Sequence, residues 1–463
     1  MKSNTFSRAF MSKPGHLSPT RVIVASFCAV ILFGTVMLML PIATRDGQLA
    51  LIDALFTATS ATCVTGLIVY DTFSKFTLFG QAVILLLIQI GGLGLVTLTT
   101  FFNLALRKKI GFKSMKLASE SISLDEAAGA KKLIYVVMRT SLGFELIGAI
   151  LLMGALVPRF GARGAWMSVF TAISAFCNAG FDLFGSLGPY SSLVPFAGSW
   201  YVLIIIMLLI VCGGLGFIVW QDLFNFHRRK KLTLHSKLVL IITACLIVGG
   251  AFAIGAMEWE NPGTMGGMTT PQKILSSLFQ SVTCRTAGFN SIDQAGMHSI
   301  SKLTCTVLMF IGAAPGGTGG GIKITTFAIV ILAVAAVLRG REDPVLRERR
   351  IDKKTVYRAL TITTLGLGVV ICTTLVMVFN TPSRGGMIDG NLVDCLYEAA
   401  SAFGTVGLSV GVTGQLSALG KAATALTMLI GRVGPISMGM TLAARADELS
   451  RREVLPEAKI VVG

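Results

Sequence analysis

Four stretches of this chain share a pattern of residues that could bind a cation through backbone oxygen atoms. Each stretch ends in a small residue, a glycine and then leucine or phenylalanine, and an aromatic residue lies about ten positions before the glycine. The glycines are Gly66, Gly180, Gly288 and Gly407, and the aromatic residues are Phe56, Phe170, Phe279 and Tyr397. Glycine adopts backbone angles closed to other residues. Four such segments around one axis could therefore turn carbonyl groups inward and replace the hydration shell of a monovalent cation.

We identify the three residues that end in each glycine as candidate filter residues. They are Val64, Thr65, Gly66, Asn178, Ala179, Gly180, Thr286, Ala287, Gly288, Thr405, Val406 and Gly407. The fourfold recurrence carries this hypothesis, because one Thr-Val-Gly by itself is common. The alternative is that the glycines only allow helices to pack closely, which is frequent in membranes.

The composition is that of a polytopic membrane protein. Of the 463 residues, 53% are hydrophobic and 14% are charged, whereas soluble domains carry roughly 25% charged residues. The nine cysteines lie singly and the four histidines form no ligand spacing, so neither a disulfide framework nor a metal site is indicated. No catalytic set of residues stands out either. The sequence therefore predicts a membrane protein that is not an enzyme and that needs no cofactor of its own.

The apolar segments form four units, each with a span, a short helix that re-enters the membrane, a glycine-containing loop and a second span. In the first unit these parts are 22–42, 50–62 and 77–106. A run of ~10–14 apolar residues is too short to cross a bilayer, which takes roughly 20. We predict an all-α fold with eight transmembrane helices, in four pseudo-repeated span–pore helix–span units around a central pore. The units are 21–113, 131–231, 235–340 and 355–447, between an N-terminal segment 1–20 and a tail 448–463.

Each closing span carries a glycine-rich break, which begins at Gly91, Gly213, Gly312 or Gly431. In three units the break begins 24 or 25 residues after the filter glycine, which supports the register of the repeat. Gly91, Gly92, Gly213 and Gly214 could serve either transport or helix packing, and the sequence does not decide between them.

The basic residues indicate the orientation in the membrane. Most of the 40 Lys and Arg residues lie in the termini and in the loops that join the units, and short basic loops stay cytoplasmic. Both termini are therefore expected in the cytoplasm and the filter stretches toward the outside. The net charge of +17 is explained by this topology and by anionic lipid, without nucleic acid. The loops 107–116, 228–231 and 339–358 either dock a partner or serve topology alone.

A second functional segment is expected at Gly312–Gly321, where seven of ten residues are Gly or Pro. A continuous helix there would lose several kcal/mol, at ~1 for each glycine and ~3 for proline, so the span should break into a loop. The candidate gate residues are Gly312, Gly316, Gly317, Thr318, Gly319, Gly320, Gly321, Lys323 and Arg432. A simple packing kink is the alternative. A phosphate-binding loop is not supported, because the required Gly-Lys-Ser/Thr sequence is missing.

Several charged residues have more than one interpretation. Arg432 falls inside the last span, where charge usually faces a cavity or a partner, or snorkels to the surface. Lys323 either lines the inner vestibule or anchors the end of its span. Asp53 and Asp394 precede the first and fourth short helices, where they suit the helix dipole or concentrate cations.

Three further charges remain ambiguous. Arg139 and Glu145 form a structural pair or separate polar contacts. Arg285 lies within the third filter stretch and could pair with a carboxylate, although the sequence indicates no particular partner.

The four stretches, the break from Ile311 to Lys323 and Arg432 together resemble the Trk/Ktr/HKT superfamily of potassium transporters, over nearly the whole chain. The chain is most similar to KtrB-type membrane subunits of bacterial Ktr systems, since the extra pair of N-terminal spans of Trk subunits is absent. The resemblance implies that potassium binds at the backbone of Gly66, Gly180, Gly288 and Gly407. Relatives that prefer sodium carry serine at the first of these positions. It also implies a gating loop inside the membrane, with Arg432 as an electrostatic obstacle below the filter.

The same resemblance implies a bacterial inner-membrane homodimer, with one pore in each subunit and a cytoplasmic KtrA-type ring of nucleotide-binding regulatory subunits. Any nucleotide is thus expected on the partner, and sodium dependence stays open. The apolar tail 460–462 either enters a dimer interface or frays. The alternative function is a proton- or sodium-coupled potassium symporter of Trk type. Such carriers usually need an embedded carboxylate, and Glu145 is the only obvious deep one.

Overall fold

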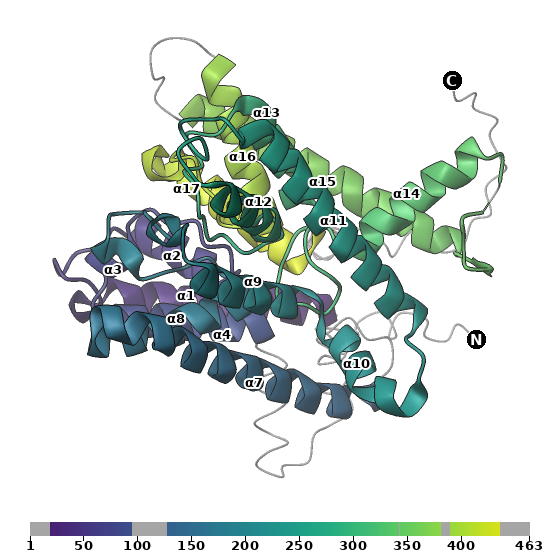
Figure 1. Cartoon of the computed structure of the whole chain (residues 1–463), viewed down its shortest axis with the longest axis horizontal. Coiled ribbons are helices and arrows are strands. Elements are labelled where there is room, and N and C mark those ends of the chain that lie inside the picture. The colour runs from purple at the N-terminus through teal and green to yellow at the C-terminus, as the bar shows by residue number, and fades with distance from the viewer. Residues whose placement is uncertain (1–18, 95–126, 342, 381–388, 436–463) are drawn as a thin grey trace, which may run out of the picture.

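The computed structural model describes residues 19–94, 127–341, 343–380 and 389–435, which are helical apart from loops and one short hairpin (Figure 1). The hairpin pairs β1 (Val345–Leu346) with β2 (Arg349–Arg350) in the third connecting loop. The helical fold class is thereby confirmed. The N-terminal residues 1–18, the basic loop 107–116, the ends of the first and fourth units and the tail 448–463 lie outside the described residues.

Four long helices are apolar enough to cross a membrane. They are α1 (Pro19–Met39), α7 (Ala127–Phe160), α11 (Leu234–Glu258) and α15 (Lys353–Asn380). Only 28–39% of the residues in their most apolar windows are buried. Phe252 and Phe379, for example, are 80% and 85% exposed. Such large apolar surfaces are not left to water in soluble proteins, so these helices present them to lipid.

Each long helix is followed by a shorter one that ends next to a filter stretch. These are α2 (Leu51–Thr62), α8 (Ala162–Phe176), α12 (Thr270–Thr283) and α16 (Asp389–Gly404). With 12–16 residues none of them reaches the ~20 that a span needs. The aromatic residue of each stretch lies on this helix, and all four aromatic side chains are completely buried. Asp394 lies inside α16 rather than before it, so that interpretation of its position was wrong.

The closing helices of the second and third units are each in two parts, and those of the first and fourth units end just after the glycines at 91–92 and 431, where the description of the chain soon stops. They are α4 (Leu78–Leu93), α9 (Trp200–Gly214) with α10 (Phe217–Arg229), α13 (Ser299–Phe310) with α14 (Ile324–Leu338), and α17 (Ala418–Val433). The chain bends by 95° between α9 and α10. Gly94 and Gly434, which follow α4 and α17, and Gly216, which precedes α10, all have positive φ. A short helix, α3 (Thr72–Lys75), and four 3-10 turns lie in the loops.

The helices are arranged in a closed circle. Within each unit, the short helix packs against the long helix before it. Across units, α4 packs on α8, α9 on α12, α13 on α16, and α17 on α2. The last of these contacts joins the two ends of the chain, and Figure 1 shows the yellow α17 above the purple α1 and α2. The four candidate filter stretches touch one another within this arrangement.

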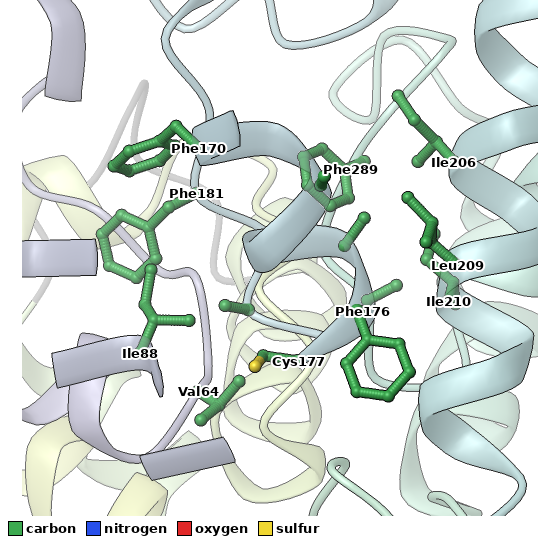
Figure 2. Packing of buried hydrophobic residues seen from close by; sticks show 14 of the residues in the cluster. Val64, Ile88, Phe170, Phe176, Cys177, Phe181, Ile206, Leu209, Ile210 and Phe289 are labelled. Atoms are coloured by element: carbon green, nitrogen blue, oxygen red, sulfur yellow. The ribbon is translucent and has the colours of Figure 1, made fainter. Parts of the chain in front are cut away.

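The buried core lies around the short helices. The largest cluster of buried side chains joins the first two units to α12 and the third filter stretch. Figure 2 shows part of it: Val64 lies near Cys177, and Phe176 points toward Leu209 and Ile210 of α9. The end of α8 is thus held on both sides, which fixes the position of the filter stretch that follows it.

A ring of four glycines and the loop beneath it

The four filter stretches share one unusual backbone conformation. Two residues before each glycine, a residue other than glycine has positive φ: Val64 (58°), Asn178 (60°), Thr286 (71°) and Thr405 (50°). The glycines follow at 88°, 69°, 83° and 98°, and the residues between them do not have positive φ. An alternation of this kind allows successive carbonyl groups to face one side of the backbone, as a carbonyl-lined cation filter requires. For β-branched residues such conformations cost on the order of 1–3 kcal/mol each and are typical of functional sites.

The four glycines are neighbours in a closed cycle. A Cβ atom on Gly66 would lie 2.4 Å from the carbonyl oxygen of Ala179, and one on Gly180 would lie 2.9 Å from that of Ala287. A Cβ atom on Gly288 would lie 2.4 Å from the oxygen of Val406, and one on Gly407 would lie 2.3 Å from that of Thr65. Each glycine therefore touches the carbonyl group that precedes the next glycine. Any side chain at these positions would push the ring apart.

Hydrogen bonds from the short helices hold the strained stretches in place. In the first and fourth stretches the glycine N–H donates to a helix hydroxyl, from Gly66 to Ser60 Oγ (3.1 Å) and from Gly407 to Ser401 Oγ (3.0 Å). In the second and third stretches the helix hydroxyl donates instead to the carbonyl after the glycine. Those bonds run from Ser174 to Phe181 and from Thr283 to Phe289, both at 2.6 Å. Each stretch is thus tied to its own helix.

Two polar side chains that the sequence analysis missed brace the segments after the third and fourth stretches. Glu398 is fully buried and accepts hydrogen bonds from Ser409 Oγ (2.5 Å) and Thr413 Oγ1 (2.7 Å), as well as from backbone N–H groups of 410, 412 and 413. Gln280 exchanges hydrogen bonds with Gln294. Both residues directly follow the aromatic residue of their stretch, which is the signal that could have identified them.

Two ion pairs join neighbouring units. Lys421 Nζ on α17 lies 2.6 Å from Asp53 Oδ1 on α2, and Lys302 Nζ on α13 lies 2.8 Å from Asp394 Oδ1 on α16. Each pair links a closing helix to the short helix of the next unit around the circle. Asp53 does lie in the first turn of α2, as expected. Each carboxylate faces a lysine, which reduces the net negative charge that either could offer to cations.

The loop between α13 and α14 lies directly against the filter stretches. A Cβ atom on Gly319 would lie 2.0 Å from Thr286 Oγ1, and one on Gly320 would lie 2.3 Å from Thr405 Oγ1. The N–H of Gly320 also donates to Thr405 Oγ1 (3.0 Å). On the other side, N–H groups of Ala314 and Thr318 donate to carbonyl groups at the end of α9. Glycine is needed at positions 319 and 320 because the side chains of Thr286 and Thr405 leave no room for a Cβ atom there.

Two basic side chains donate hydrogen bonds to carbonyl groups of this loop. Arg432 on α17 donates to the carbonyl oxygen of Thr318 and to those of Gly91 and Gly92 at the end of α4. Lys323 Nζ donates to the oxygen of Gly319 (2.6 Å). Arg432 therefore connects the loop to the first and fourth units, and Lys323 closes it locally.

The glycines of the closing helices serve packing. A Cβ atom on Gly91, Gly213 or Gly431 would lie 1.9 Å from a carbonyl oxygen of the short helix in the same unit. The packing interpretation therefore holds for Gly91 and Gly213. The carbonyl of Gly91 in addition takes part in the contact with Arg432.

Among the described residues, Arg139 and Glu145 do not form an ion pair with each other. Glu145 is buried and accepts hydrogen bonds from Gln89 Nε2 at 3.1 Å, and Cys177 Sγ lies 3.9 Å from its Oε1. Arg139 is exposed on the same helix. Asn178 and Thr286 join the second and third stretches, since the side-chain amide lies 3.2 Å from Thr286 Oγ1.

Three comparisons with known proteins agree with this arrangement. The potassium/sodium uptake protein NtpJ of Enterococcus hirae is 39% identical over 97% of this chain and 98% of that protein. The Ktr system potassium uptake protein B of Bacillus subtilis is 39% identical over 97% of both chains. The crystal structure of the potassium transporter TrkH from Vibrio parahaemolyticus has the same fold, with a TM-score of 0.70 at 17% identity over 93% of this chain and 86% of that one.

These matches confirm the resemblance to the Trk/Ktr/HKT superfamily. The model of one family, described as TrkH, cation transport protein, matches residues 12–450. Because that range is most of the chain, the protein belongs to this family of cation transport proteins.

Proposed function

We propose that this chain carries potassium ions across the bacterial cytoplasmic membrane, through the ring at Gly66, Gly180, Gly288 and Gly407. The observation that carries the proposal is the closed cycle of these glycines, together with the alternating backbone, which allows carbonyl groups to face one side. Carbonyl rings of this kind replace the hydration shell of potassium in known filters. The names of the two relatives support potassium as the ion.

The proposal includes four span–pore helix–span units with eight spans around this path, and cytoplasmic termini. Its support is the circle in which every closing helix packs on the next short helix. The short helices direct their C-terminal ends toward the ring, where the partial negative charge of the helix dipole favours a cation. Glycine at all four ring positions excludes the serine that sodium-preferring relatives carry.

The loop 312–321 is the gate in this proposal. It lies against Thr286 and Thr405 of the filter stretches, and Arg432 and Lys323 hold it there through its carbonyl groups. Ions pass when these contacts break and the loop moves aside. Arg432 also places a positive charge next to the path, which opposes cations while the loop is closed.

A regulatory partner completes the proposed system. The Bacillus subtilis relative is named as one protein of a Ktr system, which supports a partner subunit. The homodimer and the KtrA-type nucleotide-binding ring on which it docks come from the resemblance to the superfamily alone. The exposed hairpin at 345–350 and the residues around it are candidate docking surfaces, because Arg347, Arg349 and Arg350 are exposed there.

Coupled symport is the second candidate, and Glu145 is the observation that favours it. Its carboxylate is buried next to Cys177, which ends the second short helix, and next to Gln89, which precedes the carbonyl groups that bind Arg432. A proton or sodium ion at Glu145 would thus be close to both the filter and the gate. Sodium dependence belongs to this candidate as well as to a sodium-activated channel.

The test of transport is growth and ion flux with Gly288→Ser. The chain, with a KtrA-type partner, is expressed in bacteria that lack potassium uptake and grow on low-potassium medium. The Cβ atom at 288 would meet Val406 O, so we expect this variant to lose growth and potassium selectivity. Gly249→Ser is the matched control, because nothing lies within 4 Å of that position. Equal growth and selectivity of the two variants would refute the filter assignment.

A further inference from the structure

Arg285 is a buried cation without a counter-charge in the part of the chain that the structure describes. It follows the C-terminal end of α12 and is only 7% exposed. Its Nε has no hydrogen-bond partner, and none of the ion pairs between described residues includes its guanidinium group. Leaving a charge unpaired in a protein interior costs several kcal/mol. The dipole of α12 offsets part of that cost, because its negative end faces Arg285.

Arg285 lines a small cavity, and a second polar side chain that has no hydrogen-bond partner among the described residues lines it too. Thr243 on α11 is 5% exposed, and its Oγ1 makes no hydrogen bond with any described residue. Other buried threonines on long helices, such as Thr35 and Thr374, donate to the carbonyl group four residues earlier. Thr243 and Arg285 line one cavity together with Ile210, Val211, Gly214, Ile247 and Val282. Its polar side chains are thus a guanidinium and a hydroxyl, which are both hydrogen-bond donors.

We propose that this cavity binds a single-atom inorganic anion of the halide class, between the guanidinium of Arg285 and the hydroxyl of Thr243. Both groups can donate hydrogen bonds to the anion, and the remaining walls are apolar. The cavity is small, with room for about one water molecule. A halide ion is somewhat larger, so the apolar side chains around it would have to move apart slightly, whereas carboxylate and phosphate groups, which have three or more heavy atoms, would require a much larger displacement.

The bound anion would balance a charge that otherwise opposes transport. Arg285 precedes the ring glycine Gly288 by three positions in the sequence, and a positive charge there raises the free energy of any cation in the ring. The cavity is also close to the second filter stretch and to the loop 312–321. Gly214 is on the wall of the cavity. A Cβ atom there would lie 3.4 Å from Asn178 Nδ2 and 4.0 Å from Ala313 Cβ in the loop.

Bromide tests the site without any assay of transport. Crystals of the full chain are grown with bromide in place of chloride, and anomalous scattering is recorded. We expect a bromide peak between Arg285 and Thr243 in the wild type, and its loss in Arg285→Gln. A wild-type crystal without that peak overturns the proposal. This readout stands even if the proposed potassium function fails, because it measures the anion directly.

Flux measurements test the consequence for transport, and this arm rests on the proposed function. Proteoliposomes with the chain and its regulatory partner take up radioactive rubidium in chloride or in gluconate, which is too large for the cavity. We expect wild-type uptake to fall about tenfold in gluconate, because the uncompensated charge repels cations. Arg285→Gln should be insensitive to the anion, whereas Arg139→Gln, which removes an exposed cation, should behave like the wild type. Equal wild-type uptake in both salts would overturn the charge-balancing role.

Discussion

Replacement of Arg432 by glutamine should open the proposed gate. Arg432 donates to Thr318 O in the loop and to Gly91 O and Gly92 O on α4. A hydrogen bond to a charged group contributes about 1.5–3 kcal/mol, and Arg432 makes one such bond to the loop. Loss of about 2 kcal/mol changes the ratio of closed to open loop by about 30-fold, because 1.4 kcal/mol is tenfold. Potassium flux without activation should rise by up to that factor.

The assay is rubidium uptake into proteoliposomes that contain the membrane subunit alone. Arg432→Lys separates a latch from a simple charge barrier, because lysine keeps the charge but lacks the planar fork that reaches two carbonyl groups. If the latch matters, uptake through the lysine variant should rise as it does with glutamine. Leu426→Ala, at an exposed position of the same helix, is the control and should leave uptake unchanged. Uptake through Arg432→Gln at the wild-type level would refute the reasoning.

Three further changes test the surroundings of the ring. Asp53→Asn leaves Lys421 buried and unpaired, so the protein should lose about 3 kcal/mol of stability, which thermal unfolding in detergent measures. A double variant that adds Lys421→Gln and recovers none of this stability would contradict the pairing. Glu398→Ala removes the acceptor of several hydrogen bonds behind the fourth stretch, so selectivity for potassium over sodium should fall. Unchanged selectivity in competition uptake would show that the hydrogen bonds of Glu398 are dispensable. Glu145→Gln should leave the dependence of potassium accumulation on a proton or sodium gradient unaltered if transport is channel-like, whereas loss of that dependence would favour the coupled symporter.

The repeat was predictable because its physical causes are local. Three features of each unit are visible in the sequence: a glycine where φ is positive, a buried aromatic residue on the helix before it, and an apolar run of limited length. Gly66, Gly180, Gly288 and Gly407 could therefore be identified from the sequence, although the sequence does not show that they lie next to one another. The break after Phe310 was predictable for the same reason, since six glycines and a proline cannot continue a helix without a large cost.

The contacts between units could not be predicted from the sequence. Asp53 and Lys421 are 368 positions apart, and only the closure of the circle brings α17 onto α2. The carbonyl partners of Arg432 were equally hidden, because a carbonyl group gives no signal in the residue type. Glu398 was overlooked because an acidic residue in the sequence does not indicate which N–H groups will surround its carboxylate.

Thallium(I), which is similar in size to potassium and scatters X-rays anomalously, shows in crystals of the full chain whether cations bind at the ring of four carbonyl-bearing stretches. We predict a thallium peak on the axis between the carbonyl groups of Thr65, Ala179, Ala287 and Val406, and a weaker one or none in Gly288→Ser. A wild-type crystal in which thallium binds elsewhere but leaves this ring without a peak would contradict cation binding at the ring.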